Sequence, residues 1–353
     1  MRARFVSLLA ALAAAVLAPV PTAAGLVACG GTVTTSITFD ANLDCAGDGL
    51  IVGADKVTID LNGFALSGNT TGVGIQVLGF EKVTIENGLI ESFEDGIHVG
   101  GNAQKVKITD VTVFGCQGDG IDLDDSDAGK VKGCFLNGNL LRGLTIGPGG
   151  QGNKIEKTTA VGHSTAGFEV GGSGNVLKKV DAAVNTQGIL LLGDGNEVSS
   201  CRALRSADHG IEIEGSSNEV AKCDIAGSLS EGILVDGGSG NVLEKNVVTG
   251  SRQDGILLTD ADGTVVKKNT VSASELDGIA VAADSAGVLV EGNESFGNHT
   301  DGIDTESAST TLKKNEVYAN GELGIEADGG AIDGGGNEAR DNADGGCTGG
   351  IEC

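Results

Sequence analysis

The sequence predicts an all-β solenoid of about twelve stacked coils, each formed by one repeat of 21 to 24 residues. A glycine followed by an apolar residue returns at this nearly constant interval, which is typical of units that bury their apolar faces only against their neighbours. With 60 glycines and no long run of good helix formers after residue 24, helical repeats are disfavoured. The twelve pairs are Gly74-Ile75, Gly96-Ile97, Gly120-Ile121, Gly143-Leu144, Gly167-Phe168, Gly188-Ile189, Gly210-Ile211, Gly232-Ile233, Gly255-Ile256, Gly278-Ile279, Gly302-Ile303 and Gly324-Ile325.

Each repeat is expected to contain short strands separated by turns. The first and third residues after the repeat glycine are mostly apolar, as in Ile97 and Val99, so the second residue points outward with the two-residue period of a strand. A second apolar column follows later in the repeat. Three residues after it, an inward column reads Thr158, Val180, Cys201, Cys223, Asn246, Asn269, Asn293 and Asn315.

The turns carry residues that suit left-handed backbone. Gly-Asn or Ser-Asn opens coil after coil, ending at Asn153, Asn175, Asn196, Asn218 and Asn241. An aspartate often precedes the repeat glycine, and this pair suits a turn in which the glycine is left-handed.

These repeats resemble the coils of the right-handed parallel β-helix proteins of the pectin-lyase-like type. The segments "EDGIHV", "GDGIDL", "SEGILV", "QDGILL", "LDGIAV" and "TDGIDT" carry the resemblance, which covers roughly residues 56 to 337. It implies a single chain wound as a right-handed parallel β-helix. The family includes lyases, hydrolases, epimerases and adhesins, so the resemblance predicts the fold and leaves the activity open.

The N-terminus reads as a secretory signal peptide over residues 1–24. Arg2 and Arg4 precede an apolar stretch, which Pro19, Pro21 and a small-residue cleavage site follow. We expect an N-terminal cap at 25–55, repeats at 56–333 and a disulfide-bonded cap at 334–353. The protein is therefore expected to be secreted or periplasmic, with no transmembrane segment.

The eight cysteines are even in number, as expected of disulfides in an exported protein. Cys29 with Cys45, and Cys347 with Cys353, flank the repeats and are expected to staple the ends. "LVAC" before Cys29 also resembles a lipoprotein box, but lipidation would leave one cysteine unpaired. Two further pairings stay open, because Cys201 and Cys223 could be bonded or stacked as thiols, and Cys116 and Cys134 lie at different points of adjacent coils.

The net charge of −26 limits the classes of partner. Removing the two arginines of the signal peptide leaves 21 basic against 49 acidic residues, a net charge of −28. Such a surface repels nucleic acids and anionic membranes, and it opposes unassisted binding of polyuronates. The chain has no Trp and a single Tyr, Tyr318, so aromatic sugar platforms are not evident.

Polar residues gather at the outward positions of the second to fourth repeats. His98, Asp119, Asp122 and Arg142 could supply an acid, a base and an electrostatic clamp for sugar chemistry. The carboxylates could instead bind Ca²⁺, the one cofactor that the sequence suggests. The alternative is a solvated surface whose aspartates serve the turns. The calcium candidates are Asp119, Asp122, Asp124, Asp125 and Asp127.

A search for complete catalytic motifs finds none. "HTDGID" at 299–304 is similar to a polygalacturonase segment, but the further aspartate pair, the Gly-His-Gly and the Arg-Ile-Lys of that family are missing. We therefore predict a secreted, monomeric binding or structural module on a cell envelope or an extracellular polysaccharide. The alternative is a polysaccharide lyase, epimerase or glycosidase that acts on the strand face near Asp119.

Overall fold

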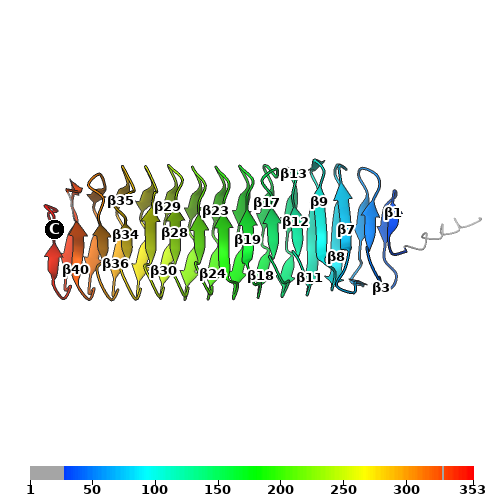
Figure 1. Cartoon of the computed structure of the whole chain (residues 1–353), viewed down its shortest axis with the longest axis horizontal. Helices are drawn as coiled ribbons and strands as arrows, with labels where there is room; N and C mark the ends of the chain where they lie inside the picture. The colour runs from blue at the N-terminus through cyan, green and yellow to red at the C-terminus, as the bar shows by residue number, and fades with distance from the viewer. Residues whose placement is uncertain (1–27, 328–329) are drawn as a thin grey trace, which may run out of the picture.

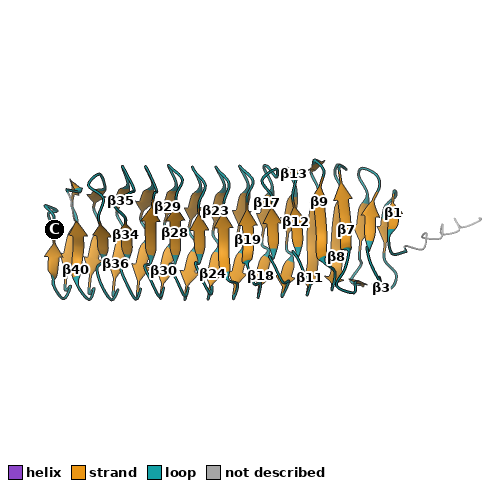
Figure 2. Cartoon of the chain, viewed as in Figure 1, coloured by secondary structure: helices purple, strands orange, loops and turns teal. Residues whose placement is uncertain are grey.

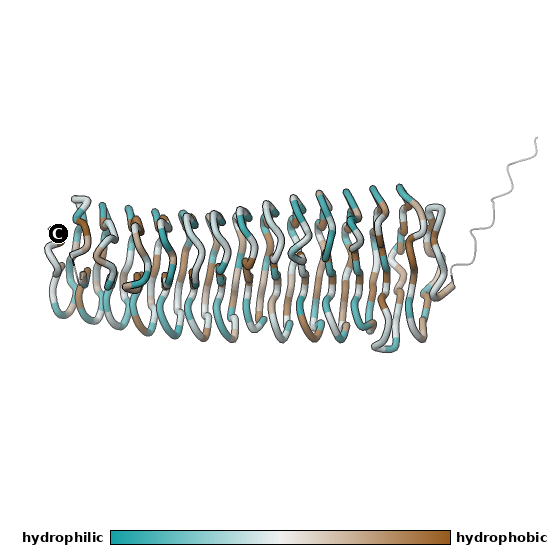
Figure 3. Tube along the Cα trace, turned by 45° about the horizontal axis from the view of Figure 1, so that its top comes forward, coloured by the Kyte–Doolittle hydropathy of each residue, from teal (hydrophilic) through white to brown (hydrophobic). Residues whose placement is uncertain are grey.

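The computed structural model describes residues 28–327 and 330–353, and these form one long solenoid of stacked coils (Figure 1). The described residues form strands, turns and bends, with no helix among them (Figure 2). The proposed signal peptide at 1–24 lies outside the described residues. Hydrophobic and hydrophilic stretches alternate along each coil (Figure 3), as expected when inward and outward residues share every strand.

One 15-stranded parallel sheet, here called sheet A, runs the length of the solenoid with one strand from each coil. It consists of β1 (Gly31–Val33), β4 (Leu50–Val52), β7 (Val73–Leu78), β9 (Asp95–Gly100), β12 (Ile121–Leu123), β16 (Leu144–Ile146), β19 (Ala166–Val170), β22 (Gln187–Leu191), β25 (Ile211–Ile213), β28 (Ile233–Asp236), β31 (Ile256–Thr259), β34 (Ile279–Val281), β37 (Ile303–Thr305), β40 (Leu323–Ala327) and β43 (Gly345–Cys347).

The second strands of the coils stack in parallel on the next side of the solenoid. They are β2 (Ile37–Thr38), β5 (Thr58–Asp60), β8 (Thr84–Glu91), β11 (Lys107–Phe114), β14 (Lys130–Lys132), β17 (Lys154–Glu156), β20 (Val176–Lys178), β23 (Glu197–Ser199), β26 (Glu219–Ala221), β29 (Val242–Glu244), β32 (Val265–Lys267), β35 (Leu289–Glu291), β38 (Thr311–Lys313) and β41 (Ile332–Gly335). Two short strands, β10 (Ala103–Gln104) and β13 (Ser126–Asp127), pair separately beside them.

The third strands complete each coil, and β8 and β11 run through both the second and the third positions. The remaining third strands are β3 (Leu43–Asp44), β6 (Ala65–Ser67), β15 (Phe135–Asn137), β18 (Thr159–Val161), β21 (Asp181–Ala183), β24 (Arg202–Leu204), β27 (Asp224–Ala226), β30 (Val247–Thr249), β33 (Thr270–Ser272), β36 (Glu294–Phe296), β39 (Glu316–Tyr318) and β42 (Glu338–Arg340).

The ends are built from the same coil as the middle. β1 pairs in parallel with β4, and β43 pairs in parallel with β40, so the coil pattern extends into the segments expected as caps at 25–55 and 334–353. The sequence pattern missed three strands of sheet A. Gly49-Leu50 lies 25 residues before Gly74, Gly31 occupies the position of the aliphatic residue in the first coil, and Cys347 occupies it in the last.

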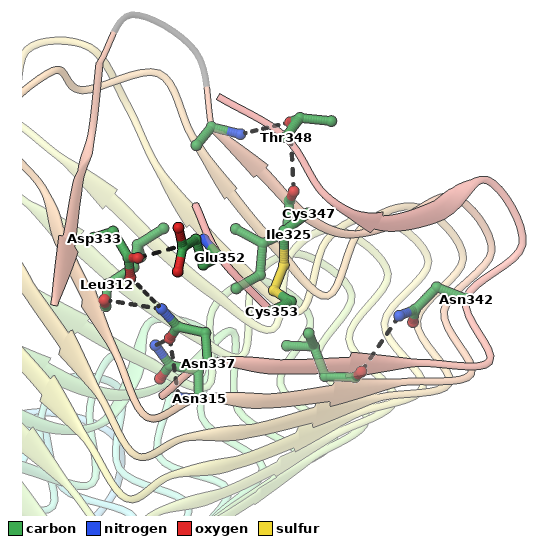
Figure 4. The surroundings of a disulfide bond; sticks show 12 residues. Leu312, Asn315, Ile325, Asp333, Asn337, Asn342, Cys347, Thr348, Glu352 and Cys353 are labelled. Carbon is green, nitrogen blue, oxygen red and sulfur yellow. Dashed lines mark hydrogen bonds between the residues drawn. A yellow bond between two sulfur atoms is a disulfide. The ribbon is translucent and has the colours of Figure 1, made fainter. Parts of the chain in front are cut away.

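Each end of the described solenoid carries a disulfide. Cys29 is bonded to Cys45, and Phe39 is buried near that end. At the other end Cys347 is bonded to Cys353 (Figure 4). Ile351, between these two cysteines in the chain, is only 6% exposed and belongs to the hydrophobic core. These are the two pairs that the sequence placed at the ends. Their closed loops span the points where a solenoid would otherwise expose its core.

The repeat glycines are required by close packing. None of the twelve repeat glycines, all of which are described, has a positive φ. The prediction of left-handed glycines at these positions is therefore wrong. A Cβ on Gly143 would lie 2.5 Å from the carbonyl oxygen of Gly167 and 2.7 Å from Cβ of Ala160. The left-handed residues lie instead before the asparagines, at Gly152, Gly174, Gly195, Ser217 and Gly240, as the sequence predicts.

Inward asparagines link neighbouring coils through ladders of hydrogen bonds. Asn269 Oδ1 accepts from the backbone N–H of Asn246 at 2.9 Å, and its Nδ2 donates to the carbonyl of Leu243 at 2.9 Å. The same column contains the Cys201–Cys223 disulfide, where Cys223 Sγ takes the place of the asparagine acceptor for Cys201 N–H at 3.3 Å. Cys116 and Cys134 are buried free thiols, and burial raises the pKa of each to about 11.

Candidate functional site

The outer face of sheet A carries the residues just before the repeat glycine and two residues after it. The second of these columns is aligned strand by strand: His98 on β9 lies beside Asp122 on β12, which lies beside Thr145 on β16. Thr145 lies in turn beside Glu169 on β19. Parallel stacking therefore brings together side chains that are 23 or 24 residues apart in the chain.

The aspartates before the repeat glycines bond to the backbone of the next coil. Asp95 Oδ1 accepts from Asp119 N–H at 2.8 Å, and Asp119 Oδ1 accepts from Arg142 N–H at 3.0 Å. Asp254 and Asp277 repeat the arrangement further along the solenoid. This bond explains why an acidic residue recurs at this position, and it leaves the second carboxylate oxygen for other partners.

His98 and Asp122 form a close pair across β9 and β12. Nδ1 of His98 lies 2.7 Å from Oδ2 of Asp122, and both side chains remain partly exposed. The hydrogen bond with Asp122 raises the pKa of His98 above its usual range, although burial opposes the shift. The structure thus joins two of the four catalytic candidates as a polarised pair at the surface.

Arg142 lies between two carboxylates. It contacts Glu169 through Nε and lies 3.6 Å from Oδ2 of Asp119, which also accepts from Thr145 Oγ1 at 2.7 Å. Burial raises the pKa of Asp119, while its bonds with Thr145 and Arg142 limit the rise. Because Glu169 and Asp119 already neutralise the guanidinium, Arg142 is poorly placed to bind the carboxylate of a sugar acid. Glu169 was not among the site residues predicted from the sequence.

The five aspartates proposed for calcium do not converge on one point. Asp119 bonds to Arg142 and Thr145, Asp122 to His98, and Asp127 accepts from Gln151 N–H at 3.1 Å. Within residues 28–327 and 330–353, no group of three or more His, Cys, Asp and Glu side chains is placed to hold a metal ion. The calcium site stays a prediction, and its formation would require these bonds to rearrange.

A second polar cluster, on β22, β25 and β28, was not recognised from the sequence. His209 Nδ1 lies 2.8 Å from Glu231 Oε2, and Gln187 contacts Glu212 one coil earlier. Glu231 and Glu212 are only 5% and 8% exposed. Burial lowers the pKa of His209, but the contact with Glu231 and the nearby charges of Asp208 and Glu212 outweigh it and raise the pKa. The sequence could have indicated this cluster, because both outward columns contain polar residues in these successive repeats.

Comparisons with known proteins identify the fold family of the chain. A family model described as "Right handed beta helix region" matches residues 27–186 and 209–352. The chain belongs to this family of right-handed β-helix proteins. No sequence among the curated proteins matches it. Within the described residues, no helix is long and apolar enough to cross a membrane.

Three solved β-helix structures are similar to the chain. The A-module of the mannuronan C-5 epimerase AlgE6 of Azotobacter vinelandii is 14% identical, with a TM-score of 0.50 over 91% of this chain and 87% of that one. A double mutant of the periplasmic alginate epimerase AlgG is 12% identical, with a TM-score of 0.57 over 86% and 78%. The tailspike protein of Escherichia coli bacteriophage HK620, in complex with a hexasaccharide, is 12% identical, with a TM-score of 0.57 over 77% and 59%. At these identities the similarity extends to the fold alone.

Proposed function

We propose that this β-helix protein binds an extracytoplasmic polysaccharide along the outer face of sheet A. The observation that carries the proposal is the aligned row of hydrogen-bonding side chains His98, Asp122, Thr145 and Glu169, which continues after Leu190 at Glu212. Planar carboxylates and an imidazole at strand spacing can accept and donate to the hydroxyl groups of successive sugars. The row follows the long axis, so a linear chain could lie along it.

Two further observations support the class of ligand and the compartment. The structural neighbours are named for mannuronan, for alginate and for a bound hexasaccharide, so proteins of this shape are suited to long sugar chains. Three disulfides support an oxidising, extracytoplasmic location. The secretory signal peptide stays part of the proposal.

A second candidate function is modification of the bound polysaccharide at the same place. It is favoured by the nearness of Asp119, whose pKa burial raises, to the His98–Asp122 pair, because a carboxyl group and an imidazole can serve as acid and base in sugar chemistry. Binding is the better supported function, since Arg142 is already neutralised and each carboxylate of the site has a protein partner.

A binding screen tests the proposal. The protein is applied to immobilised neutral and uronate-containing polysaccharides, beside the double variant Asp122→Asn with Glu169→Gln. A matched control, Asp224→Asn with Glu219→Gln, makes the same charge change on the outward sides of β27 and β26. We expect the sheet A variant to lose affinity by about tenfold, as for two charge-assisted hydrogen bonds, with little change in the control.

Binding to no polysaccharide, or equal losses in both variants, would contradict the proposal. The same incubations separate the two candidate functions. New reducing ends, unsaturated products or a changed ratio of uronate epimers, all abolished by Asp122→Asn, would establish the enzymatic alternative.

A further inference from the structure

The lysines of this acidic protein lie on one side of the solenoid. Each of the sixteen is within two residues of a second strand, and neither sheet A nor the third strands contain one. The outer face of sheet A carries carboxylates in both outward columns and no lysine. The lysines are therefore unevenly distributed around the coil, and on the second strands they lie among carboxylates such as Glu156, Glu197 and Glu219.

Eight of these lysines form a patch over four neighbouring coils. They fall within residues 105–179, on or beside β11, β14, β17 and β20, and we call them the lysine face. The outward positions of the same segments include two carboxylates, Asp110 and Glu156. Lys107, Lys130 and Lys154 are directly aligned on successive strands, so their backbones are about 4.8 Å apart.

Most of this positive charge is uncompensated. Within the described residues, Lys130 alone of the eight has a carboxylate in ion-pairing distance, Glu156 at 2.8 Å. The hydrogen bond from Lys130 and the charges of Lys132 and Lys178 lower the pKa of Glu156, which is the effect of a positive potential. Like charges stacked on adjacent strands destabilise a sheet, so this arrangement favours an external anion.

The surroundings limit what can dock here. The outward positions of the flanking coils are acidic, with Glu81 and Glu86 on one side and Glu197 and Glu219 on the other. Beyond the bend that follows the second strand, Phe114 and Phe135 on β11 and β15 are 46% and 43% exposed. The third strands of the same coils thus add exposed aromatic rings to the surface, and lysines on one strand with aromatic rings on the next suit a ligand that combines anionic groups with apolar ring faces.

We propose that the lysine face binds a linear anionic polysaccharide whose chain runs along the solenoid axis. The spacing of the lysine column is close to the length of one sugar unit in an extended chain, so one anionic group per sugar can meet one lysine per coil. A polyuronate and a sulfated polysaccharide share this chemistry. The inference rests on the proposed function for the ligand class, a polysaccharide. It adds that a second face of the solenoid binds this ligand and that the ligand is anionic.

Nucleic acid is the less suitable polyanion. Double-stranded DNA carries a charge about every 1.7 Å, so the acidic coils on both sides of the patch would repel it strongly. A polysaccharide has a lower charge density and offers ring faces to Phe114 and Phe135. The net negative charge of the protein opposes binding of polyuronates, but the lysine face provides one region where they can bind.

The test compares two triple variants of the full-length protein. One replaces Lys107, Lys130 and Lys154 by Gln. The matched control replaces Lys245, Lys267 and Lys313, which lie on or beside the second strands of later coils and pair with Glu244 and Glu291. Affinities for alginate, dextran sulfate, neutral dextran and double-stranded DNA are measured at low and high salt. The single variant Lys154→Gln provides a milder perturbation, and circular dichroism checks the fold of each protein.

We expect alginate or dextran sulfate to bind with an affinity that salt weakens, to lose about tenfold in the first triple variant, and to change less than about twofold in the control. Equal losses in both triple variants would overturn the inference, as would DNA binding of the same strength and the same lysine dependence. If a neutral polysaccharide binds through sheet A and no anionic one binds, the proposed function survives and this inference fails. If no glycan binds at all, both fail.

Discussion

The second strands of the solenoid carry lysines in both halves, but the later half neutralises more of them. In the earlier half Glu156 lies between Lys132 and Lys178 and pairs with Lys130, whereas the neighbouring lysine column has no aligned carboxylate. In β29, β32, β35 and β38, Glu244, Lys267, Glu291 and Lys313 alternate on successive strands, with ion pairs at 3.2 and 2.9 Å. In β11, β14 and β17 three lysines are aligned without such alternation. One coil geometry thus supports a self-neutralised surface and a surface that needs an external anion.

The interiors of the two halves differ as well. The later half has an unbroken ladder from Asn246 to Asn337. In the earlier half the same column contains Thr158, Val180 and the Cys201–Cys223 disulfide. The earlier half has a ladder at a different turn of the coil, from Asn153 to Asn241. The two halves therefore differ in which turn the inward asparagines stabilise.

The largest effect is expected from breaking the asparagine ladder. Asn269→Leu keeps the approximate shape but leaves Asn246 N–H without its acceptor and removes the bond from Asn269 Nδ2 to the Leu243 carbonyl, at a cost of about 3 kcal/mol. Thr158→Val, at the same position of an earlier coil, removes one hydrogen bond to Glu156 O and should cost about 1 kcal/mol. Chemical denaturation followed by circular dichroism compares the two, and equal losses would show that the halves do not differ in this way.

A second difference should be visible in the pH dependence of stability. Burial raises the pKa of Asp301 to about 7, well above the value of about 3.9 for an unfolded aspartate. A raised carboxyl pKa adds stability below about pH 4, and this stability is lost as the pH rises through about 7. Asp301→Asn keeps an acceptor for Leu323 N–H and should melt higher than the native protein at alkaline pH, but not at acid pH.

The control for this prediction is Asp262→Asn, since the exposed Asp262 also accepts one backbone N–H, from Ala286 at 2.7 Å. It should lack the alkaline gain. If both variants gained equally in melting temperature at alkaline pH, the effect would come from the change in net charge and not from the burial of Asp301.

The smallest effect concerns thermal stability without ligand. Exposed ion pairs contribute about 0.2 to 1 kcal/mol, so replacing Lys245, Lys267 and Lys313 by Gln should lower the melting temperature slightly. Replacing Lys107, Lys130 and Lys154 removes one ion pair, Lys130–Glu156, but relieves repulsion, so it should lower the melting temperature less than the later triple does. Scanning calorimetry at low salt measures both, and an equal or larger drop for the earlier triple would contradict the expected repulsion among these lysines.

Sequence reasoning recovered the solenoid because one glycine and its apolar neighbour return in every coil. The prediction of about twelve coils is close to the structure, and the end strands fall outside the pattern because Gly31 and Cys347 replace the aliphatic residue. The repeat glycines were misjudged because their crowding comes from the next coil. The His98–Asp122 pair could be predicted from the sequence, because both residues occupy the same outward column in successive repeats. The roles of Glu169 and Glu231 depend on side-chain reach across strands, and the lysine face becomes visible only when the second strands are known.

The most direct test of the account is a map of lysine reactivity on the native protein. Because lysines are distributed along the whole second-strand side, acetylation followed by mass spectrometry, with and without alginate or dextran sulfate, reports where an anionic polysaccharide lies. We predict protection of Lys107, Lys132 and Lys154, while Lys222, Lys268 and Lys314 keep their reactivity. Uniform protection along the solenoid, or none at saturating polysaccharide, would contradict the claim that the earlier half carries a binding surface of its own.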